Sequence, residues 1–122
     1  MAKIQEVRVR RVYDGRDKAD GKRVLVDRIW PRGVTKAKAD LDEWCKTVAP
    51  TTGLRKWYDH DPKRFAEFTR RYRAELAEPD SAAALAHLAA LGEKGTLTLL
   101  TATTHPETSE AAVLADLLRV RM

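Results

Sequence analysis

The residues best suited to chemistry lie in charged clusters that directly follow apolar, strand-like segments. The longest cluster contains Asp27, Arg28, Trp30, Arg32 and Gly33. A guanidinium binds carboxylates and phosphates through paired hydrogen bonds, and glycine lets the backbone approach a ligand closely. We therefore predict that Arg28 and Arg32 hold a small anion, that Asp27 orients them, and that Trp30 walls the pocket or stacks on a ring. The alternative is an internal Asp–Arg pair that braces a turn, with Trp30 in the core.

A second charged cluster, Arg11-Val12-Tyr13-Asp14, lies upstream and could face the first. Arg11 and Tyr13 are candidate ligand-binding residues because both side chains donate hydrogen bonds. Asp14 could act as a hydrogen-bond acceptor or a general base. Asp14-Gly15 is also a common turn-forming pair, which gives this cluster an ordinary structural interpretation.

Residues 54–61 place aromatic rings between basic groups. Arg55 and Trp57 are candidate ligand-binding residues, since stacking surfaces flanked by cations can hold single-stranded bases. The three-residue spacing of Leu54 and Trp57 equally fits a helix face that packs in the core. His60 is a candidate acid or base near neutral pH. No paired His or Cys spacing occurs, so we predict no metal site and can specify no cofactor.

Composition limits the class of protein. The chain has 122 residues, of which 43% are hydrophobic and 34% are charged, as is typical of soluble globular proteins. No apolar run is long enough to span a bilayer, and the first residues lack the apolar core of a signal peptide. With a single cysteine, Cys45, these features predict a cytoplasmic protein without membrane contact. Nucleophile-elbow, Walker A and dinucleotide-binding glycine motifs are also missing from the sequence, which argues against those enzyme classes.

The distribution of charge suggests anionic partners. The net charge is +5, with +8 in residues 1–76 and −3 in residues 77–122. A phosphorylated metabolite, a nucleotide, nucleic acid or an acidic protein would be attracted to the basic part. The predicted helix at residues 62–77, rich in arginine, makes a nucleic-acid-binding module the main alternative to an anion pocket. A protein-interaction module is the other alternative, and a solvated basic surface would explain the same charge.

Hydrophobic periodicity indicates the elements that position these clusters. Strands are predicted at about residues 4–12, 24–29 and 96–102, and helices at about residues 41–48, 54–58, 62–77, 81–92 and 106–119. Strands joined through helices favour parallel pairing. We expect an α/β fold in a single small domain, residues 1–122, with a mostly parallel three-stranded sheet, one more short strand allowed, and about five helices. Ligand sites in such sheets lie beyond the carboxyl ends of the strands.

Two helix boundaries have specific signals. Asp40 with Glu43 resembles a capping box and predicts that a helix starts at Leu41, which would place Cys45 on a buried apolar stripe. Gly92 is expected to end the Ala/Leu-rich helix that starts near Asp80.

The same stretches resemble the YeaO-like proteins, a bacterial and archaeal family known as a domain of unknown function (DUF488). The resemblance covers nearly the whole chain, and its most specific string is Asp27-Arg28-Ile29-Trp30-Pro31-Arg32-Gly33. It implies a small α/β domain without an established activity. Where such proteins often read Leu-Leu-Tyr-Ala and, later, a polar pair that includes Asn, this chain has Leu100-Thr101-Ala102 and Ser109-Glu110. Any role of that Tyr and Asn is therefore not carried over to this chain.

Overall fold

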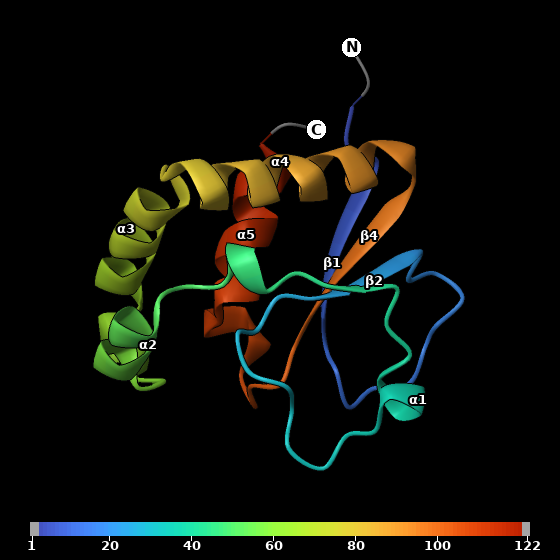
Figure 1. Ribbon diagram of the computed structural model, residues 1–122, viewed down its shortest axis with the longest axis horizontal. Helices are drawn as coiled ribbons and strands as arrows, with labels where there is room; N and C mark the ends of the chain where they lie inside the picture. Colours follow the sequence, from blue (N-terminus) through green and yellow to red (C-terminus); the bar gives the residue numbers. More distant parts are fainter. Residues whose placement is uncertain (1–2, 121–122) are drawn as a thin grey trace.

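Four parallel strands form one sheet in the computed structural model, which describes residues 3–120 (Figure 1). The strands are β1 (Glu6–Arg11), β2 (Lys22–Leu25), β3 (Glu43–Trp44) and β4 (Thr96–Thr101), in the spatial order β1-β4-β2-β3. β4 pairs in parallel with β1 and with β2, and β2 pairs in parallel with β3. The expected α/β class with a parallel sheet is confirmed, and β3 is the additional short strand.

Five α-helices accompany the sheet: α1 (Lys36–Ala39), α2 (Thr52–Tyr58), α3 (Phe65–Leu76), α4 (Pro79–Lys94) and α5 (Glu110–Arg119). Short 3-10 turns at Pro62–Arg64 and Pro106–Thr108 precede α3 and α5. Side-chain caps define several helix starts. Thr51 caps α2, and Ser109 caps α5 by accepting from the N–H of Ala112.

The predicted helix at residues 41–48 is wrong. Asp40 ends α1 in the left-handed conformation, and Glu43 and Trp44 then pair with β2. Tertiary contacts outweigh the local helical pattern here, because the Trp44 Nε1 donates to the carbonyl oxygen of Asp27 at 2.7 Å and its ring packs edge-on against Trp30. The predicted end of α4 at Gly92 is also wrong. Gly92 lies inside the helix, where a Cβ would come within 3.0 Å of Ile4.

The two faces of the sheet are covered differently. Helices α3, α4 and α5 pack one face, where strand residues such as Val24, Leu97 and Leu99 join an extensive apolar core. Loops and α1 cover the other face, which has only a small apolar cluster that includes Val12 and Leu25. In Figure 1, α1 accordingly lies on the side of the strands away from α3. The small apolar cluster is therefore not the main interaction that holds the loops to this face.

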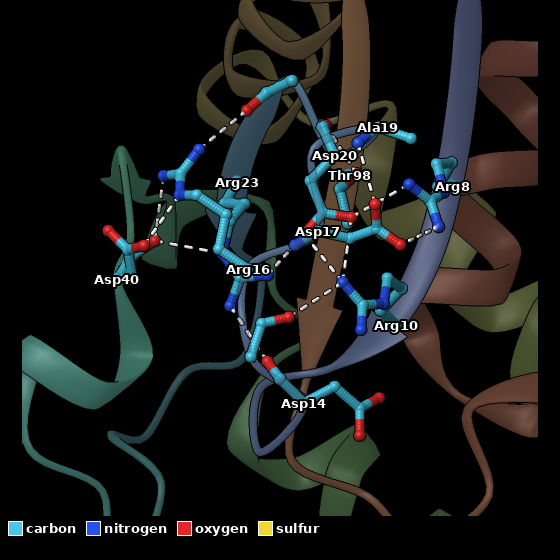
Figure 2. A network of polar contacts seen from close by, with 12 residues as sticks. Arg8, Arg10, Asp14, Arg16, Asp17, Ala19, Asp20, Arg23, Asp40 and Thr98 are labelled. Atoms are coloured by element: carbon cyan, nitrogen blue, oxygen red, sulfur yellow. Dashed lines mark hydrogen bonds and ion pairs between the residues drawn. The ribbon is translucent and has the colours of Figure 1, made fainter.

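An ion network around Asp20 holds loop residues to this face of the sheet (Figure 2). The Asp20 carboxylate is fully buried and accepts from Arg8 and Arg10 of β1 and from Arg23 of β2, at 3.1, 2.7 and 2.6 Å. Arg23 is fully buried as well, and its guanidinium also donates to three backbone carbonyls, those of Asp14, Ala39 and Asp40. Burial alone would raise the pKa of Asp20, but these donors and the Asp17 N–H lower it to about 2.

Candidate functional site

A pocket of about 720 Å³ opens beyond the carboxyl ends of β2 and β4. Its lining comes from the segment that follows β2, from α2, from the residues after β4 and from the start of α5. This volume is within the range of about 300–1,000 Å³ that is usual for small-molecule sites. The location agrees with the rule that parallel sheets place ligands at the carboxyl ends of their strands.

The pocket brings together most of the residues that the sequence singled out. Seven of them line it: Tyr13, Asp27, Arg28, Trp30, Arg32, Arg55 and His60. Four others lie outside its lining: Arg11, Asp14, Gly33 and Trp57. The three charged stretches thus meet in the pocket: residues 27–33 contribute four of the seven, residues 54–61 contribute two, and residues 11–14 contribute one. Their roles in binding or catalysis stay predictions.

Asp27 is held rigidly at the sheet side of the pocket. Its Oδ1 accepts from the Thr101 hydroxyl and its Oδ2 accepts from the Ala102 N–H, both at 2.8 Å. Since Thr101 ends β4, the strand itself fixes the orientation of this carboxylate. Asp27 therefore faces the last residues of β4, and Arg28 does not pair with it as a brace of the turn.

Glu110 is a pocket residue that the sequence did not single out as a candidate. It is the first residue of α5 and its half-buried carboxyl group lies against that of Asp27. Burial, and then the hydrogen bond with Asp27, raise the pKa of Glu110 well above its usual value. The only sequence signal was the departure from the family pattern at Thr101 and at Ser109-Glu110. In the structure, the Thr101 hydroxyl donates to Asp27, and the Glu110 carboxyl group is hydrogen-bonded with Asp27.

The cationic side chains of the pocket differ in whether they hydrogen-bond to other parts of the protein. Arg28 donates to the carbonyl oxygens of Ala49 and Pro50, at 3.1 and 3.0 Å, and so anchors the chain that leads into α2. Across the described residues 3–120, the side chains of Arg32, Arg55 and Lys56 make no hydrogen bond or ion pair. Arg55 is half-buried, and its positive charge partly opposes the rise in the pKa of Glu110.

The candidates outside the lining have structural contacts. Arg11 donates to the carbonyl oxygen of Thr103 and stacks on the Tyr13 ring, and the Tyr13 hydroxyl donates to the carbonyl oxygen of Arg32. The Trp57 ring is covered by the guanidinium of Arg71, 4.3 Å from its centroid. These contacts shape the surroundings of the pocket without placing Arg11 or Trp57 in it.

Some arginines of the basic helix predicted to bind nucleic acid form ion pairs within that helix. On α3, the Glu67 carboxylate accepts from Arg70 and from Arg71. These two guanidinium groups lower the pKa of Glu67 to about 2. Arg73 is exposed on the same helix. Nucleic-acid binding and protein interaction through this helix stay predictions.

Two structural features concern metal binding and membrane insertion. Within residues 3–120, no group of three or more His, Cys, Asp and Glu side chains could hold a metal ion. No helix in the same part of the chain has the length and apolar character required to cross a membrane.

Comparison with known proteins gives the family. The family model described as "Inactive DUF488-N3 subclade" matches residues 6–122. The chain belongs to the DUF488 family. This DUF488 protein is 50% identical over 121 residues to uncharacterized proteins of Mycobacterium tuberculosis and Mycobacterium bovis, covering 99% of this chain and 100% of each relative. It is 42% identical over 113 residues to the uncharacterized protein YeaO of Escherichia coli, covering 93% of this chain and 96% of that one.

The resemblance to YeaO-like proteins is thereby confirmed for this DUF488 chain. No solved structure matches the chain.

Proposed function

We propose that the protein binds a small anionic ligand, bearing a phosphate or a carboxylate, in the pocket at the carboxyl ends of the strands. The observation that carries the proposal is Arg55, a half-buried guanidinium in the pocket lining that no side chain of the described residues engages. A partly desolvated cation is costly unless it is paired. A ligand anion would supply the missing partner, and a guanidinium suits phosphate and carboxylate through its paired donors.

The surroundings of Arg55 strengthen this proposal. Lys56 and Arg32 line the same pocket and have no internal partner among residues 3–120, so an anion could contact two or three cations at once. The surplus of basic residues in the first part of the chain would also draw anions toward the molecule and raise the rate of capture.

Binding without turnover is the form of the proposal that the family supports. The subclade whose model matches the chain is described as inactive. Of the three candidate acid–base residues, Asp14 lies outside the lining, while Asp27 and His60 line it. In a binding protein these two groups would orient the ligand rather than transfer a proton to it.

The test is calorimetric titration of the protein with inorganic phosphate, pyrophosphate and citrate at low salt. We expect Arg55→Ala to weaken binding at least about tenfold, the loss typical of a charge-assisted hydrogen bond. Arg73→Ala is the matched control, because it removes the same charge from an exposed site outside the pocket. Failure of all three anions to bind, or equal weakening in the two variants, would contradict the pocket proposal.

A parallel arm addresses nucleic acid. Fluorescence anisotropy with a short single-stranded DNA, read across a salt series, measures binding to the basic helix. Binding of DNA alone, lost in Arg73→Ala and retained in Arg55→Ala, would replace the pocket proposal with the nucleic-acid alternative.

A further inference from the structure

The pocket carries charges of both signs. Its lining includes the carboxyl groups of Asp27 and Glu110 and the basic groups of Arg32, Arg55 and Lys56. A ligand that satisfies both kinds of group contacts more than one element of the fold. Charge of both signs in one pocket calls for a ligand with two different ends.

A simple anion would leave the two carboxyl groups without a ligand partner. Inorganic phosphate is far smaller than a pocket of about 720 Å³, and it would be repelled wherever it approached the carboxyl pair. The two carboxyl groups instead present oxygen atoms that accept hydrogen bonds from a neutral or positively charged donor. The end of the ligand that faces Asp27 is therefore a hydrogen-bond donor and not a second anion.

The cations of the pocket decide between a hydroxyl and an ammonium donor. Arg32, Arg55 and Lys56 line the same pocket, and their side chains have no internal partner among residues 3–120. A ligand ammonium would add another positive charge to this group, whereas a hydroxyl would not. Thr101 and Ala102 already donate to Asp27 from the protein side, which leaves the pocket side of the pair for ligand hydroxyls.

We propose that the pocket binds a phosphorylated polyol, the chemical class that includes pentose phosphates and nucleoside monophosphates. The phosphate would lie at Arg55 and Lys56, and the hydroxyls at Asp27 and Glu110. This inference rests on the proposed anion-binding function, and it adds the second end of the ligand. The pocket volume accommodates such a molecule, since it exceeds the roughly 300 Å³ of the smallest common ligand sites.

The experiment compares four probes by calorimetry: ribose 5-phosphate, adenosine 5′-monophosphate, inorganic phosphate and ribose. We expect either phosphorylated polyol to bind at least about tenfold more tightly than inorganic phosphate, because two ends contact the protein instead of one. Tighter binding of the monophosphate identifies a nucleotide, and tighter binding of ribose 5-phosphate identifies a free sugar phosphate. Ribose alone should bind too weakly to measure.

Variants separate the two ends. Glu110→Ala should remove the advantage of the phosphorylated polyol and leave binding of inorganic phosphate unchanged or stronger, since it deletes acceptor atoms and reduces repulsion. Arg55→Ala should weaken both. Asp27→Asn tests the other carboxylate, but it also disturbs the contact of Asp27 with β4. The Glu110 carboxyl has no such contact with the strand, so Glu110→Ala keeps the test independent of folding.

The outcomes distinguish this inference from the proposed function. Equal affinity for inorganic phosphate and both polyol phosphates, with dependence on Arg55, would overturn the polyol inference while the anion pocket stands. An advantage of the polyol phosphates that survives in Glu110→Ala and in Asp27→Asn would also overturn it. Absence of binding by any phosphate probe would overturn both.

Discussion

Asp20 and Asp27 are two aspartates that sit at the same sheet, each near several arginines, but they are held in different ways. Asp20 is fully buried and receives hydrogen bonds from three guanidinium groups at once (Figure 2). Asp27 is half-buried in the pocket lining and receives its hydrogen bonds from Thr101 and Ala102. The first carboxylate engages three arginines, and the second engages none of the arginines that line the pocket.

The arginines of the two regions show the same contrast. Arg23 is fully buried, and its donors are occupied by the Asp20 carboxylate and by backbone carbonyls. Arg55 is half-buried, and no side chain within residues 3–120 engages it. A cluster of charges is therefore structural when its donors are used internally, and it is a candidate site when partly buried donors remain free.

Removing the Asp20 carboxylate should have the largest effect. Asp20→Ala leaves the buried Arg23 guanidinium without its charge partner, and breaking a buried pair from one side typically costs about 3–5 kcal/mol. Urea unfolding followed by circular dichroism measures the change in the free energy of unfolding. Asp14→Asn is the control, since the Asp14 side chain is exposed, and it should change stability by no more than about 0.5 kcal/mol. Similar small effects in both variants would show that the network is dispensable.

Acidification should weaken the same network. The pKa of Asp20 is lowered from 3.8 to about 2 in the folded protein, so the unfolded chain binds more protons between these values. The stability that Asp20 contributes is present above about pH 4 and is lost as the pH falls through 2, a loss of about 2 kcal/mol by linkage. Unfolding free energies measured from pH 7 to pH 2 should fall more steeply in the wild type than in Asp20→Asn. Equal slopes would rule out this role for Asp20.

The sequence was sufficient to predict the pocket's position. Apolar runs identify β1 and β4, and they identify β2 with shifted bounds, residues 24–29 in place of Lys22–Leu25. Parallel strands share an edge at their carboxyl ends. That rule predicts that Asp27, Arg28 and Arg32 lie near the end of β4, and all three line the pocket with Thr101. Arg55 was predicted independently as a ligand-binding residue, from its place beside aromatic residues in the segment that forms α2.

The Asp20 network could not have been predicted in the same way. Residues 14–21 are polar and bounded by glycines, which is typical of an exposed loop. The burial of Asp20 arises only when β1 and β2 flank β4, and at Gly21 (φ +61) a Cβ would lie 2.2 Å from the carbonyl oxygen of Thr96. No local pattern encodes that approach.

Glu110 and β3 were missed for a related reason. Glu110 looks like an ordinary acidic residue in the first turn of a helix, and only the fold places it against Asp27, which is 83 positions earlier in the printed numbering. Glu43 and Trp44 have a helical pattern with their neighbours, yet contacts of Trp44 with Asp27 and Trp30 favour a strand. In both cases the deciding partner is distant in the sequence.

Glu110 should respond to pH with the opposite sign to Asp20. Its pKa is raised in the fold, so stability is highest below the usual glutamate pKa of 4.5 and is lost as the pH rises toward the raised value. Glu110→Gln removes the ionisable group and should therefore stabilise the protein at neutral pH, by about 0.5–2 kcal/mol, a gain typical of relieving a functional site. Thermal unfolding at pH 5 and pH 8 measures it. A loss of stability at pH 8 would show that the Glu110 carboxyl group supports the fold.

Arg32→Ala should produce the smallest change in stability. The contact that the structure records for Arg32 is made by its backbone carbonyl, which accepts from the Tyr13 hydroxyl at 3.2 Å and which alanine retains. The side chain is exposed at the pocket, so we expect the free energy of unfolding to change by no more than about 0.5 kcal/mol while phosphate binding weakens. Chemical denaturation and calorimetric titration of the same preparation give both quantities. Because Asp20→Ala should show a large loss of stability, a large loss in Arg32→Ala as well would mean that both charged regions are structural, and the contrast between them would fail.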